Sequence, residues 1–381
     1  MATRLGLGIK SEDGLVKRLG EIEPIAVLYQ VRPLPPVDGI AKPPKPGGFA
    51  DSGADIAFGL RTQDVAVCTL TAKADPSVDL DWVFPDDEEG MRDASNRGAQ
   101  TLWLNCGLYS GHPAEAVHAQ SFSFVGQRPS SVARFDDKLF TNRFLAAKGL
   151  RVASSAAVDA STDLATVVLP AVVKPIRGRG SEGVAIATTR VELCSMVHAL
   201  VSAVVEVDGV ARSQFGPRVM VEEFLPGEEL TVTVMPPGVY ELCGRCTEKE
   251  SYWALPPVRR FDHVDGVAPY NGIVPVARNS VVLSPDELRD PHTRALMLEC
   301  ERAAKLVEAR APIRIDCRRG DDRTFRLFDL NMKPNMTGPG RPGRDDQDSL
   351  VALSARAVGW SYGDLLLNIA GQAWRAASND R

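Results

Sequence analysis

Three features that would direct a chain to a membrane or to nucleic acid are missing from this sequence. No apolar run approaches the roughly 20 residues that a membrane-spanning helix requires. Residues 1–14, MATRLGLGIKSEDG, contain charge and glycine but not the apolar core of a signal peptide. The formal net charge is −5, so no excess of basic residues favours nucleic acid or an anionic membrane. We therefore expect a cytoplasmic protein that has neither nucleic acid nor a membrane among its partners.

Cysteine spacings typical of zinc sites or disulfide frameworks are also missing. The seven cysteines are an odd number and are scattered along the chain. Cys243 and Cys246 lie in the sequence CGRC, but no second pair follows to complete a zinc site. We expect free thiols in a reducing compartment.

The composition is that of an ordinary globular protein. At 381 residues, with 44% apolar and 24% charged residues, the chain is expected to form two or three domains with ample core. In its first third, apolar runs alternate with helical patterns, which predicts a parallel α/β domain. We predict strands at 24–31, 65–71, 101–105 and 121–126, a helix at 86–99, and an exposed Pro- and Gly-rich loop at 32–53.

The pattern changes after residue 130. An amphipathic helix that ends at Gly149 is followed by a mixture of strands and helices. We predict strands at 166–175, 218–225 and 229–235, helices at 189–205 and 285–309, and two helices at the end of the chain. Ser284 is the predicted N-cap of the 285–309 helix.

Residues 311–336, APIRIDCRRGDDRTFRLFDLNMKPNM, form the most informative stretch. Two runs of alternating apolar residues flank a charged turn, which predicts a β-hairpin. Asp316 and Asp329 would lie on its neighbouring strands, with Asn331 on the same face as Asp329. Two carboxylates and an amide oxygen suit a hard cation such as Mg²⁺ bound to phosphates. The alternative is a surface hairpin with ordinary ion pairs.

Two further motifs are consistent with nucleotide binding. Lys174 ends a buried strand, and Gly178, Gly180 and Gly183 follow it, so backbone N–H groups and an ammonium are available to phosphate oxygens. No GKS or GKT sequence is present, which excludes a Walker A loop. The strand 218–225 ends in Glu-Glu-Phe-Leu, whose backbone can pair with an adenine edge, and Glu229 can accept ribose hydroxyls. The alternatives are a mobile β-turn and an ordinary strand–turn–strand unit.

The N-terminal domain offers a candidate of its own. In parallel α/β sheets the ligand edge lies at the carboxyl ends of the strands. This places Asn105 and His112 at a possible site edge, with His112 as a candidate substrate contact; the alternative is a solvated histidine.

The order of these motifs resembles the ATP-grasp family, and within it the D-alanine–D-alanine ligase-like group. The order runs from Asp-Lys at 137–138 through Lys-Pro at 174–175, the glycine loop, EEFL at 222–225 and Glu229 to RID at 314–316 and DLN at 329–331. The resemblance covers residues 124–381. It implies a three-subdomain ATP-grasp fold, with an N-terminal α/β domain (1–125), a central lid (126–215) and a C-terminal subdomain carrying the hairpin (216–381).

The resemblance also implies roles for single residues. Contacts with ATP are implied for Lys138, Lys174, Gly180, Ser181, Gly183, Glu222, Glu223, Phe224, Leu225 and Glu229. Binding of Mg²⁺, or of Mn²⁺ in its place, is implied for Asp316, Asp329 and Asn331. Arg314 and Ser181 are implied to be catalytic, Arg314 by stabilising the negative oxygen of a tetrahedral intermediate. Ser349 and Leu350 match the position that holds the acceptor carboxylate, and His263 lies with Arg260 and Tyr270 in a predicted substrate-covering segment.

Four departures from the group set this sequence apart. Asp329 stands where the group usually has Glu, and Asn335 stands where it usually has Gly, next to the oxyanion pocket. The loop 337–347 is longer and carries Arg341 and Arg344, which suit an anionic substrate; the alternative is a solvated charged loop. No residues match the N-terminal Glu/Ser pair that holds the first D-alanine. These departures favour a different amino acid or a small carboxylate.

The function implied is that of an ATP-dependent carboxylate–amine ligase working through an acyl phosphate, with small-molecule carboxylate and amine substrates. A homodimer is expected from the habit of the group. One alternative is a non-catalytic nucleotide-binding protein on the same fold, and another is an ATP-grasp enzyme with a non-amine acceptor.

Overall fold

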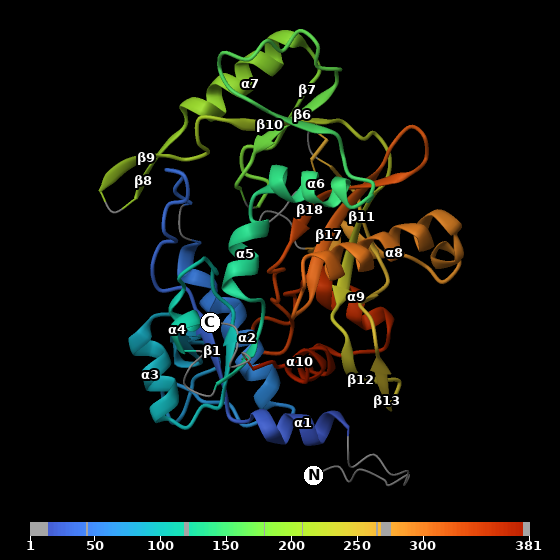
Figure 1. Ribbon diagram of the computed structural model, residues 1–381. Helices are drawn as coiled ribbons and strands as arrows, with labels where there is room; N and C mark the ends of the chain where they lie inside the picture. Colours follow the sequence, from blue (N-terminus) through green and yellow to red (C-terminus); the bar gives the residue numbers. More distant parts are fainter. Residues whose placement is uncertain are drawn as a thin grey trace.

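The computed structural model describes residues 14–42, 45–117, 122–178, 180–207, 209–263, 266–267 and 276–375. Within these residues the chain forms three main sheets and two small hairpins. Figure 1 shows the N-terminal sheet at the bottom, the largest sheet at mid-height and the remaining main sheet, described second below, at the top. No helix in the described part of the chain combines the length and hydropathy needed to cross a lipid bilayer.

The N-terminal sheet is parallel, in the order β2-β1-β3-β4. Its strands are β1 (Ile25–Tyr29), β2 (Val83–Pro85), β3 (Thr101–Leu104) and β4 (Ser123–Val125). Its helices are α1 (Leu15–Ile22), α2 (Ala50–Arg61), α3 (Glu88–Asn96) and α4 (Pro113–Val117), with short 3₁₀ turns η1 (Pro46–Phe49) and η2 (Asp79–Asp81). The strands are apolar and buried, as expected of a parallel sheet with helices on its faces.

The second sheet is antiparallel, in the order β5-β10-β6-β7, and lies at the top of Figure 1. Most of it falls within the predicted lid, and we keep the name lid for this sheet and the helices beside it. Its strands are β5 (Ser155–Val158), β6 (Ala171–Pro175), β7 (Ala185–Ala187) and β10 (Val219–Glu223). The accompanying elements are α5 (Pro129–Phe135), α6 (Lys138–Ala147), α7 (Arg190–Ser202) and the hairpin β8 (Val204–Val207) with β9 (Val210–Ser213). The strand β10 begins after residue 215, the predicted end of the lid, yet pairs with β5 and β6.

The largest sheet carries the predicted hairpin. Its strands run in the order β16-β15-β11-β17-β18, with β14 beside β11. They are β11 (Glu229–Met235), β14 (Trp253–Ala254), β15 (Val258–Arg260), β16 (Ser280–Val282), β17 (Ile313–Arg319) and β18 (Phe325–Asn331). The helix α8 (Pro291–Leu306) and the turns η4 (Val276–Arg278) and η5 (Glu287–Arg289) complete this part. Leu230, Ile313 and Ile315 are buried in one apolar cluster with residues of α8.

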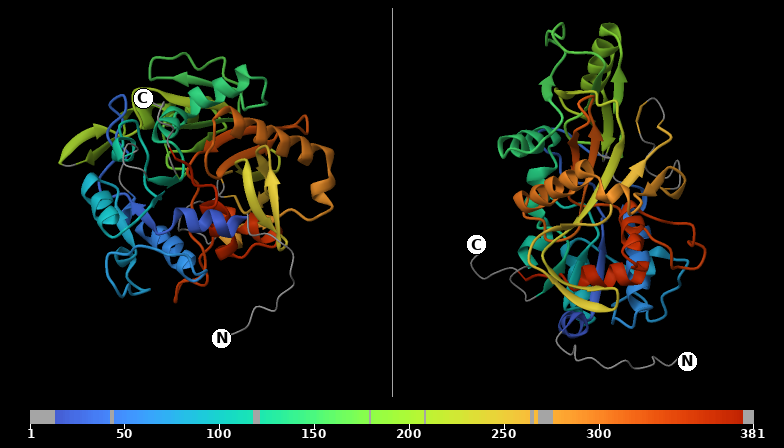
Figure 2. Two further views of the ribbon diagram at one scale, coloured as in Figure 1. Left: turned by 60° about the horizontal axis from the view of Figure 1, so that its bottom comes forward. Right: turned by 90° about the vertical axis from the view of Figure 1, so that its right-hand side faces the viewer.

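The C-terminal helices return to the N-terminal domain. They are α9 (Leu350–Ala357), which packs on strands of the largest sheet, and α10 (Tyr362–Ala370), which packs on the first strand of the hairpin β12 (Gly238–Leu242) and β13 (Arg245–Lys249). One apolar cluster joins Leu15, Ile56, Tyr240, Trp360 and Leu366. Figure 2 shows the hairpin, in yellow, lying beside the C-terminal helices, in red. The two ends of the chain therefore share one core.

Several local predictions are confirmed, and three are wrong. The 311–336 hairpin, β11 and the helices within 86–99 and 189–205 form as expected. Residues 65–71 are not a strand: only Val67 bridges to Ile25, because β2 pairs with the rest of that edge of β1. The stretch 32–53 is not loop throughout, because α2 begins at Ala50. The helix predicted from 285 begins at Pro291, with Asp290 rather than Ser284 as its N-cap.

Candidate active site

A cleft of about 560 Å³ lies where the lid, the largest sheet and the N-terminal domain meet. Val172 and Lys174 come from β6, Asp316 and Asp329 from the hairpin, and Asn105 from the end of β3. The sequence-predicted residues that line it are Lys138, Lys174, Gly180, Ser181, Glu222, Glu223, Phe224, Leu225, Glu229, Arg314, Asp316, Asp329, Asn331 and Asn335. The fold therefore brings the predicted nucleotide motifs and the predicted metal hairpin to one cavity.

Asp316 and Asp329 are direct cross-strand partners on β17 and β18. The ladder has an irregularity between Asp316 and Cys317, and Arg314 stands opposite Asn331. Directly opposed residues have Cβ atoms only about 5 Å apart, so the two carboxylates can share a ligand. The alternation of apolar and polar residues positions them, because Ile315 and Cys317 are fully buried on the other face.

Arg314 holds Asp316 in place. Its Nε lies 3.1 Å from Oδ1 and its Nη2 lies 3.0 Å from Oδ2, and Thr231 Oγ1 donates to Oδ1 at 2.8 Å. Arg314 is only 4% exposed. A bidentate, charge-assisted pair of this kind orients both groups towards the cleft that they line.

Two lysines reach the same cleft from the lid side. Lys138, the first residue of α6, pairs with Asp329, and Lys174 Nζ lies 2.7 Å from Glu222 Oε1. Burial raises the pKa of Glu222, and the attraction of Lys174 offsets this only in part. Burial also opposes ionisation of Asp329, but Lys138 and Lys174 outweigh it and hold the pKa of Asp329 below its usual range. Asp329 is therefore an anion at neutral pH.

The predicted ribose acceptor, Glu229, is contacted by a histidine and an arginine. His263 Nε2 lies 2.9 Å from Glu229 Oε2, and Arg318 Nη1 lies 3.8 Å from the same oxygen. The Arg318 guanidinium also stacks over Phe224, 5.4 Å from the ring centroid. His263 does not line the cleft itself, but it contacts Glu229, which does. Tyr270 lies outside the described residues.

The glycine loop adopts the left-handed geometry that its composition permits. Gly180 and Gly183 have φ of 64° and 72°, and Ser181 has φ of 57°. Gly180 and Ser181 line the cleft, but Gly183 faces the lid interior, where a Cβ would approach Leu200 to 2.9 Å. A side chain at residue 183 would have to displace Leu200 and adopt a positive φ, which favours glycine there, and its contact with phosphate stays a prediction.

Asn335 lines the cleft at the end of the segment that follows β18. Its Oδ1 accepts hydrogen bonds from Thr337 N at 3.2 Å and Thr337 Oγ1 at 2.8 Å. The side chain therefore folds back on its own loop, an Asx-type turn that fixes the backbone at this point.

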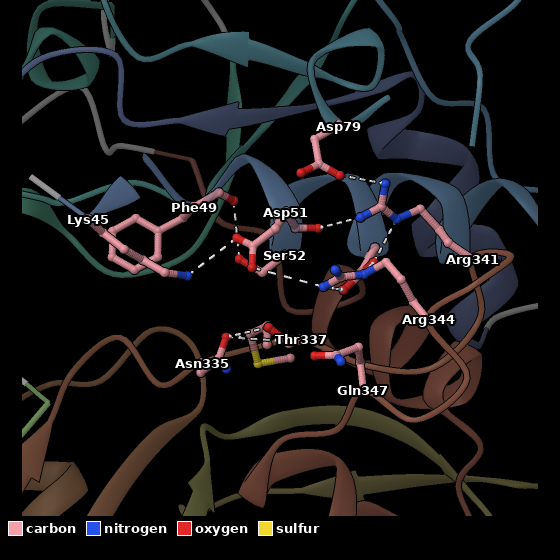
Figure 3. Close-up of polar contacts among 12 residues, drawn as sticks. Lys45, Phe49, Asp51, Ser52, Asp79, Asn335, Thr337, Arg341, Arg344 and Gln347 are labelled. Atoms are coloured by element: carbon pink, nitrogen blue, oxygen red, sulfur yellow. Dashed lines mark hydrogen bonds and ion pairs between the residues drawn. The ribbon is translucent and has the colours of Figure 1, made fainter. Parts of the chain in front are cut away.

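The two arginines of the 337–347 loop do not line the cleft. Figure 3 shows both pointing towards the segment that carries Asp51. Arg341 is 1% exposed, and its guanidinium bonds Asp55 Oδ1 at 2.7 Å and Asp79 Oδ1 at 2.8 Å. Arg344 binds both oxygens of Asp55, at 2.8 and 2.9 Å. Both arginines join the loop to the N-terminal domain, so the solvated-loop alternative is wrong, and their substrate contact stays a prediction.

Three further candidates also lie outside the cleft. Ser349 is the N-cap of α9, where its Oγ accepts from Ala352 N at 3.2 Å, and Leu350 is buried behind it. His112 is 1% exposed in the N-terminal domain. In the structure these residues serve a helix start and the core, and their substrate contacts stay predictions.

The surroundings of His112 give a physical reason for its burial. Its Nε2 lies 3.4 Å from Asp86 Oδ2 and 3.7 Å from Cys106 Sγ, and its Nδ1 accepts from Ala114 N at 3.1 Å. The three potential ligand atoms lie within 4.8 Å of one another. Because Nδ1 is an acceptor, the neutral ring carries its proton on Nε2 and offers no lone pair there to a metal.

Sequence reasoning missed one group of cleft residues. These are Lys42, Lys45, Phe49 and Lys333. They come from the Pro- and Gly-rich loop and from the segment after β18, where no periodicity marks a site. The only sequence signal was the density of lysine around KPPKPGG and the lysine in NMKPNM.

No protein-family model matches the chain. Over 265 residues the chain is 30% identical to the D-alanine–D-alanine ligase of Paracidovorax citrulli, with 67% of each chain covered. It is 29% identical over 268 residues to that of Verminephrobacter eiseniae, with 68% of this chain and 70% of the relative covered. For that of Porphyromonas gingivalis the identity is 29%, and the match spans 62% of the relative, less than two thirds of its length.

Solved structures give the same picture of the fold. The D-alanine–D-alanine ligase of Bacillus anthracis complexed with ATP superposes with a TM-score of 0.58 and 17% identity, covering 91% of this chain and 96% of that one. The ligase of Coxiella burnetii superposes with a TM-score of 0.56 and 14% identity, covering 92% and 94%. The predicted α/β architecture is therefore confirmed.

Proposed function

The chain belongs to the D-alanine–D-alanine ligase family, and on this premise we propose that it is an ATP-dependent carboxylate–amine ligase. The observation that carries the proposal is the convergence of Asp316, Asp329, Arg314, Lys138 and Lys174 on one cleft. Cations that neutralise phosphates, oxygen ligands for a metal and an arginine for developing negative charge are the groups that acyl-phosphate chemistry needs.

ATP is the proposed phosphoryl donor. Val172, Ile186, Leu225, Phe328 and Leu330 give one part of the cleft an apolar lining that suits adenine. The backbone of 222–225 supplies the hydrogen-bonding edge, and Glu229 is placed to accept ribose hydroxyls. Lys138 pairs with Asp329 of the hairpin, and Lys174 pairs with Glu222 on the neighbouring strand of its own sheet. Both lysines line the cleft, and their ammonium groups support a site for phosphates beside them.

Mg²⁺ is the proposed metal, held by Asp316, Asp329 and Asn331. The donor set fits, because two opposed carboxylates and an amide oxygen are hard ligands. Asp329 is one methylene shorter than Glu, and its position directly opposite Asp316 is what lets it serve. The metal would neutralise charge on the phosphates when bound.

The reaction proposed has two steps. A carboxylate oxygen of the acid substrate attacks the γ-phosphorus of ATP, which forms an acyl phosphate and releases ADP. The amine of the second substrate attacks the carbonyl carbon, the C–O bond to phosphate breaks, and the amine loses one proton as the amide forms. Arg314 stabilises the oxyanion of the tetrahedral intermediate, and the cleft holds the reacting groups together and restricts water. No side-chain nucleophile is required.

An assay of ADP and phosphate release tests the proposal. The purified chain is supplied with ATP, Mg²⁺ and pools of L- and D-amino acids and small carboxylates, and products are analysed by mass spectrometry. We expect ADP release that depends on an acid and an amine together, and a product lighter than the sum of the two substrates by one water. ADP release with an acid and a thiol or hydroxyl acceptor, but with no amine, would contradict amide formation. ATP binding without turnover in any pool would contradict the ligase.

Asp316→Asn is the test variant for that assay, and a second variant serves as its control. It removes one charge from the predicted metal ligands and keeps the shape of the side chain. Asp322→Asn is the comparison, because Asp322 lies in the turn of the same hairpin, outside the cleft. Only the first variant is expected to lose turnover.

A further inference from the structure

The end of the cleft formed by the N-terminal domain differs in chemistry from the nucleotide end. Lys45, Phe49, Asn105 and Lys333 line it, and we call these four residues the N-terminal end of the cleft. Lys333 Nζ lies 3.4 Å from the centroid of the Phe49 ring, and Lys45 Nζ lies 4.7 Å from the same centroid. The distance between the two ammonium nitrogens therefore cannot exceed the sum of these two distances. Two ammonium groups therefore converge on one aromatic ring.

Phe49 is held in an unusual conformation at this point. Its φ is 69° and its ψ is 17°, in the left-handed region that bulky residues rarely adopt. Its carbonyl oxygen accepts from Asn105 Nδ2 at 2.9 Å and from Ser52 Oγ at 3.1 Å, at the start of α2. Strain of this kind persists only where the surroundings enforce it, and it is found at ligand clamps.

The preceding glycine fixes the position of the ring. A Cβ at Gly48 would lie 1.8 Å from the carbonyl oxygen of Gln30, and Gln30 N donates to Gly48 O at 2.8 Å. The turn η1 is thus pressed against the end of β1. The Phe49 ring and Lys45 are carried into the cleft by this anchored turn rather than by a free loop.

Acidic groups beside this end are already paired with protein cations. Asp51 Oδ1 lies 3.3 Å from Lys45 Nζ, and Asp51 Oδ2 lies 3.9 Å from Arg344 (Figure 3). Burial opposes ionisation of Asp51, but Lys45 and a backbone hydrogen bond from Ser52 outweigh it and lower the pKa of Asp51. Asp55 is saturated by Arg341 and Arg344. Of the four residues that define this end of the cleft, two are lysines and none is acidic, while Asp51 beside it is paired with Lys45.

From this arrangement we propose that the acid substrate of the ligase carries a second carboxylate, which Lys333 and Lys45 bind beside Phe49. The substrate class is a small dicarboxylic acid or an acidic amino acid. One carboxylate reacts at the hairpin end of the cleft, and the other is held at the N-terminal end. Two ammonium groups beside one ring favour an anionic ligand over a neutral ligand of the same shape, and Lys45 would then contact both Asp51 and the bound carboxylate. Lys333 and Lys45 are specificity-determining residues in this account, which rests on the proposed function.

Pairs of acids that differ in one charge provide the test. Aspartate is compared with asparagine, glutamate with glutamine, and succinate with succinamate, each with ATP, Mg²⁺ and an amine found in the pool assay. For the wild-type chain we expect kcat/KM to be at least tenfold higher for the dicarboxylic member. Lys333→Met is expected to remove that preference through the KM of the acid and to leave the KM of ATP unchanged, and Lys333→Arg is expected to keep it. Lys305→Met, on the exposed face of α8, is the control.

A binding measurement separates this inference from the proposed function. Titration of the same acids into the chain with a non-hydrolysable ATP analogue reports binding without turnover. If turnover occurs and both members of each pair are used equally well, by the wild type and by Lys333→Met alike, the inference is wrong and the ligase stands. If no pair of substrates is turned over but binding of the dicarboxylic acids depends on Lys333, the ligase is wrong and the anion site stands. A preference for neutral amino acids, through an ammonium contact with Asp51, would overturn the inference outright.

Discussion

Arg341 and Asp55 form a buried ion pair between residues 286 positions apart in the sequence. Nε of Arg341 lies 2.7 Å from Oδ1 of Asp55, and both side chains are 1% exposed. The pair joins the loop after the predicted metal hairpin to the helix α2 that follows the strained turn at Phe49. The wall of the cleft at its N-terminal end is therefore built by contacts that span most of the chain.

Arg341→Met should destabilise the protein. Breaking a buried pair leaves Asp55 without one of its two cations and costs on the order of 3 kcal/mol. Arg344 retains its bidentate contact with Asp55, so the loss of stability should lie at the low end of the roughly 3–5 kcal/mol typical of a broken buried pair. Urea unfolding followed by tryptophan fluorescence measures the effect. The double variant Arg341→Met with Asp55→Asn should recover part of the loss; an unchanged midpoint for the single variant would contradict the role of the pair.

Asp316→Asn and Asp329→Asn should each reduce ADP release by about a thousandfold, because removing a metal ligand removes charge stabilisation worth about 4 kcal/mol. Addition of a chelator should stop the wild-type reaction, and Mg²⁺ should restore it. Asp322→Asn, in the exposed turn of the same hairpin, should stay within twofold of the wild type. Equal losses in all three variants would point to a damaged hairpin instead of a metal site.

The buried pair of Lys174 and Glu222 separates binding from stability. Lys174→Met should weaken ATP binding at least tenfold and should also lower the thermal midpoint, because Glu222 is 4% exposed and loses its cation. Adding Glu222→Gln should restore the midpoint and leave ATP binding weak. Calorimetric titration and thermal unfolding of the two variants provide both readings. Recovery of ATP binding in the double variant would show that Lys174 acts only on the fold.

The pair of Lys138 and Asp329 should give a pH-dependent contribution to stability. Because Lys138 and Lys174 lower the pKa of Asp329 in the folded state, this contribution is fully present above the unfolded carboxyl pKa of about 3.9 and is lost as the pH falls through the folded value. Lys138→Met should therefore be less stable than the wild type at pH 7, and the difference should shrink below about pH 4. A difference in stability that stays constant down to pH 3 would mean that Lys138 does not lower the pKa of Asp329.

Local periodicity was enough to predict the hairpin and the strand β11. Ile313, Ile315 and Cys317 alternate with Arg314 and Asp316, and a one-residue shift would bury the charged set. The strand at 65–71 failed for a non-local reason: its apolar run competes with β2 for the same edge of β1. No property of residues 65–71 alone reveals that competitor.

The part of the site that sequence could not predict comes from loops. The turn PGGF and the segment after β18 meet only in the folded chain, where Lys333 reaches the ring of Phe49. The pairing of Arg341 and Arg344 with Asp55 could not be predicted either, because Asp55 lies in α2, a helix far away in the sequence that was not predicted. The boundaries at residues 125 and 215 and the roles assigned to single cleft residues stay predictions.

The central claim is that a carboxylate is activated as an acyl phosphate before an amine attacks it. The most direct test supplies the acid substrate with both carboxyl oxygens labelled with ¹⁸O, together with unlabelled ATP, Mg²⁺ and the amine. Attack of the carboxylate on the γ-phosphorus predicts that one ¹⁸O leaves in inorganic phosphate and that the other stays in the amide carbonyl. Inorganic phosphate that carries no ¹⁸O, formed at the same rate as the product, would contradict the account.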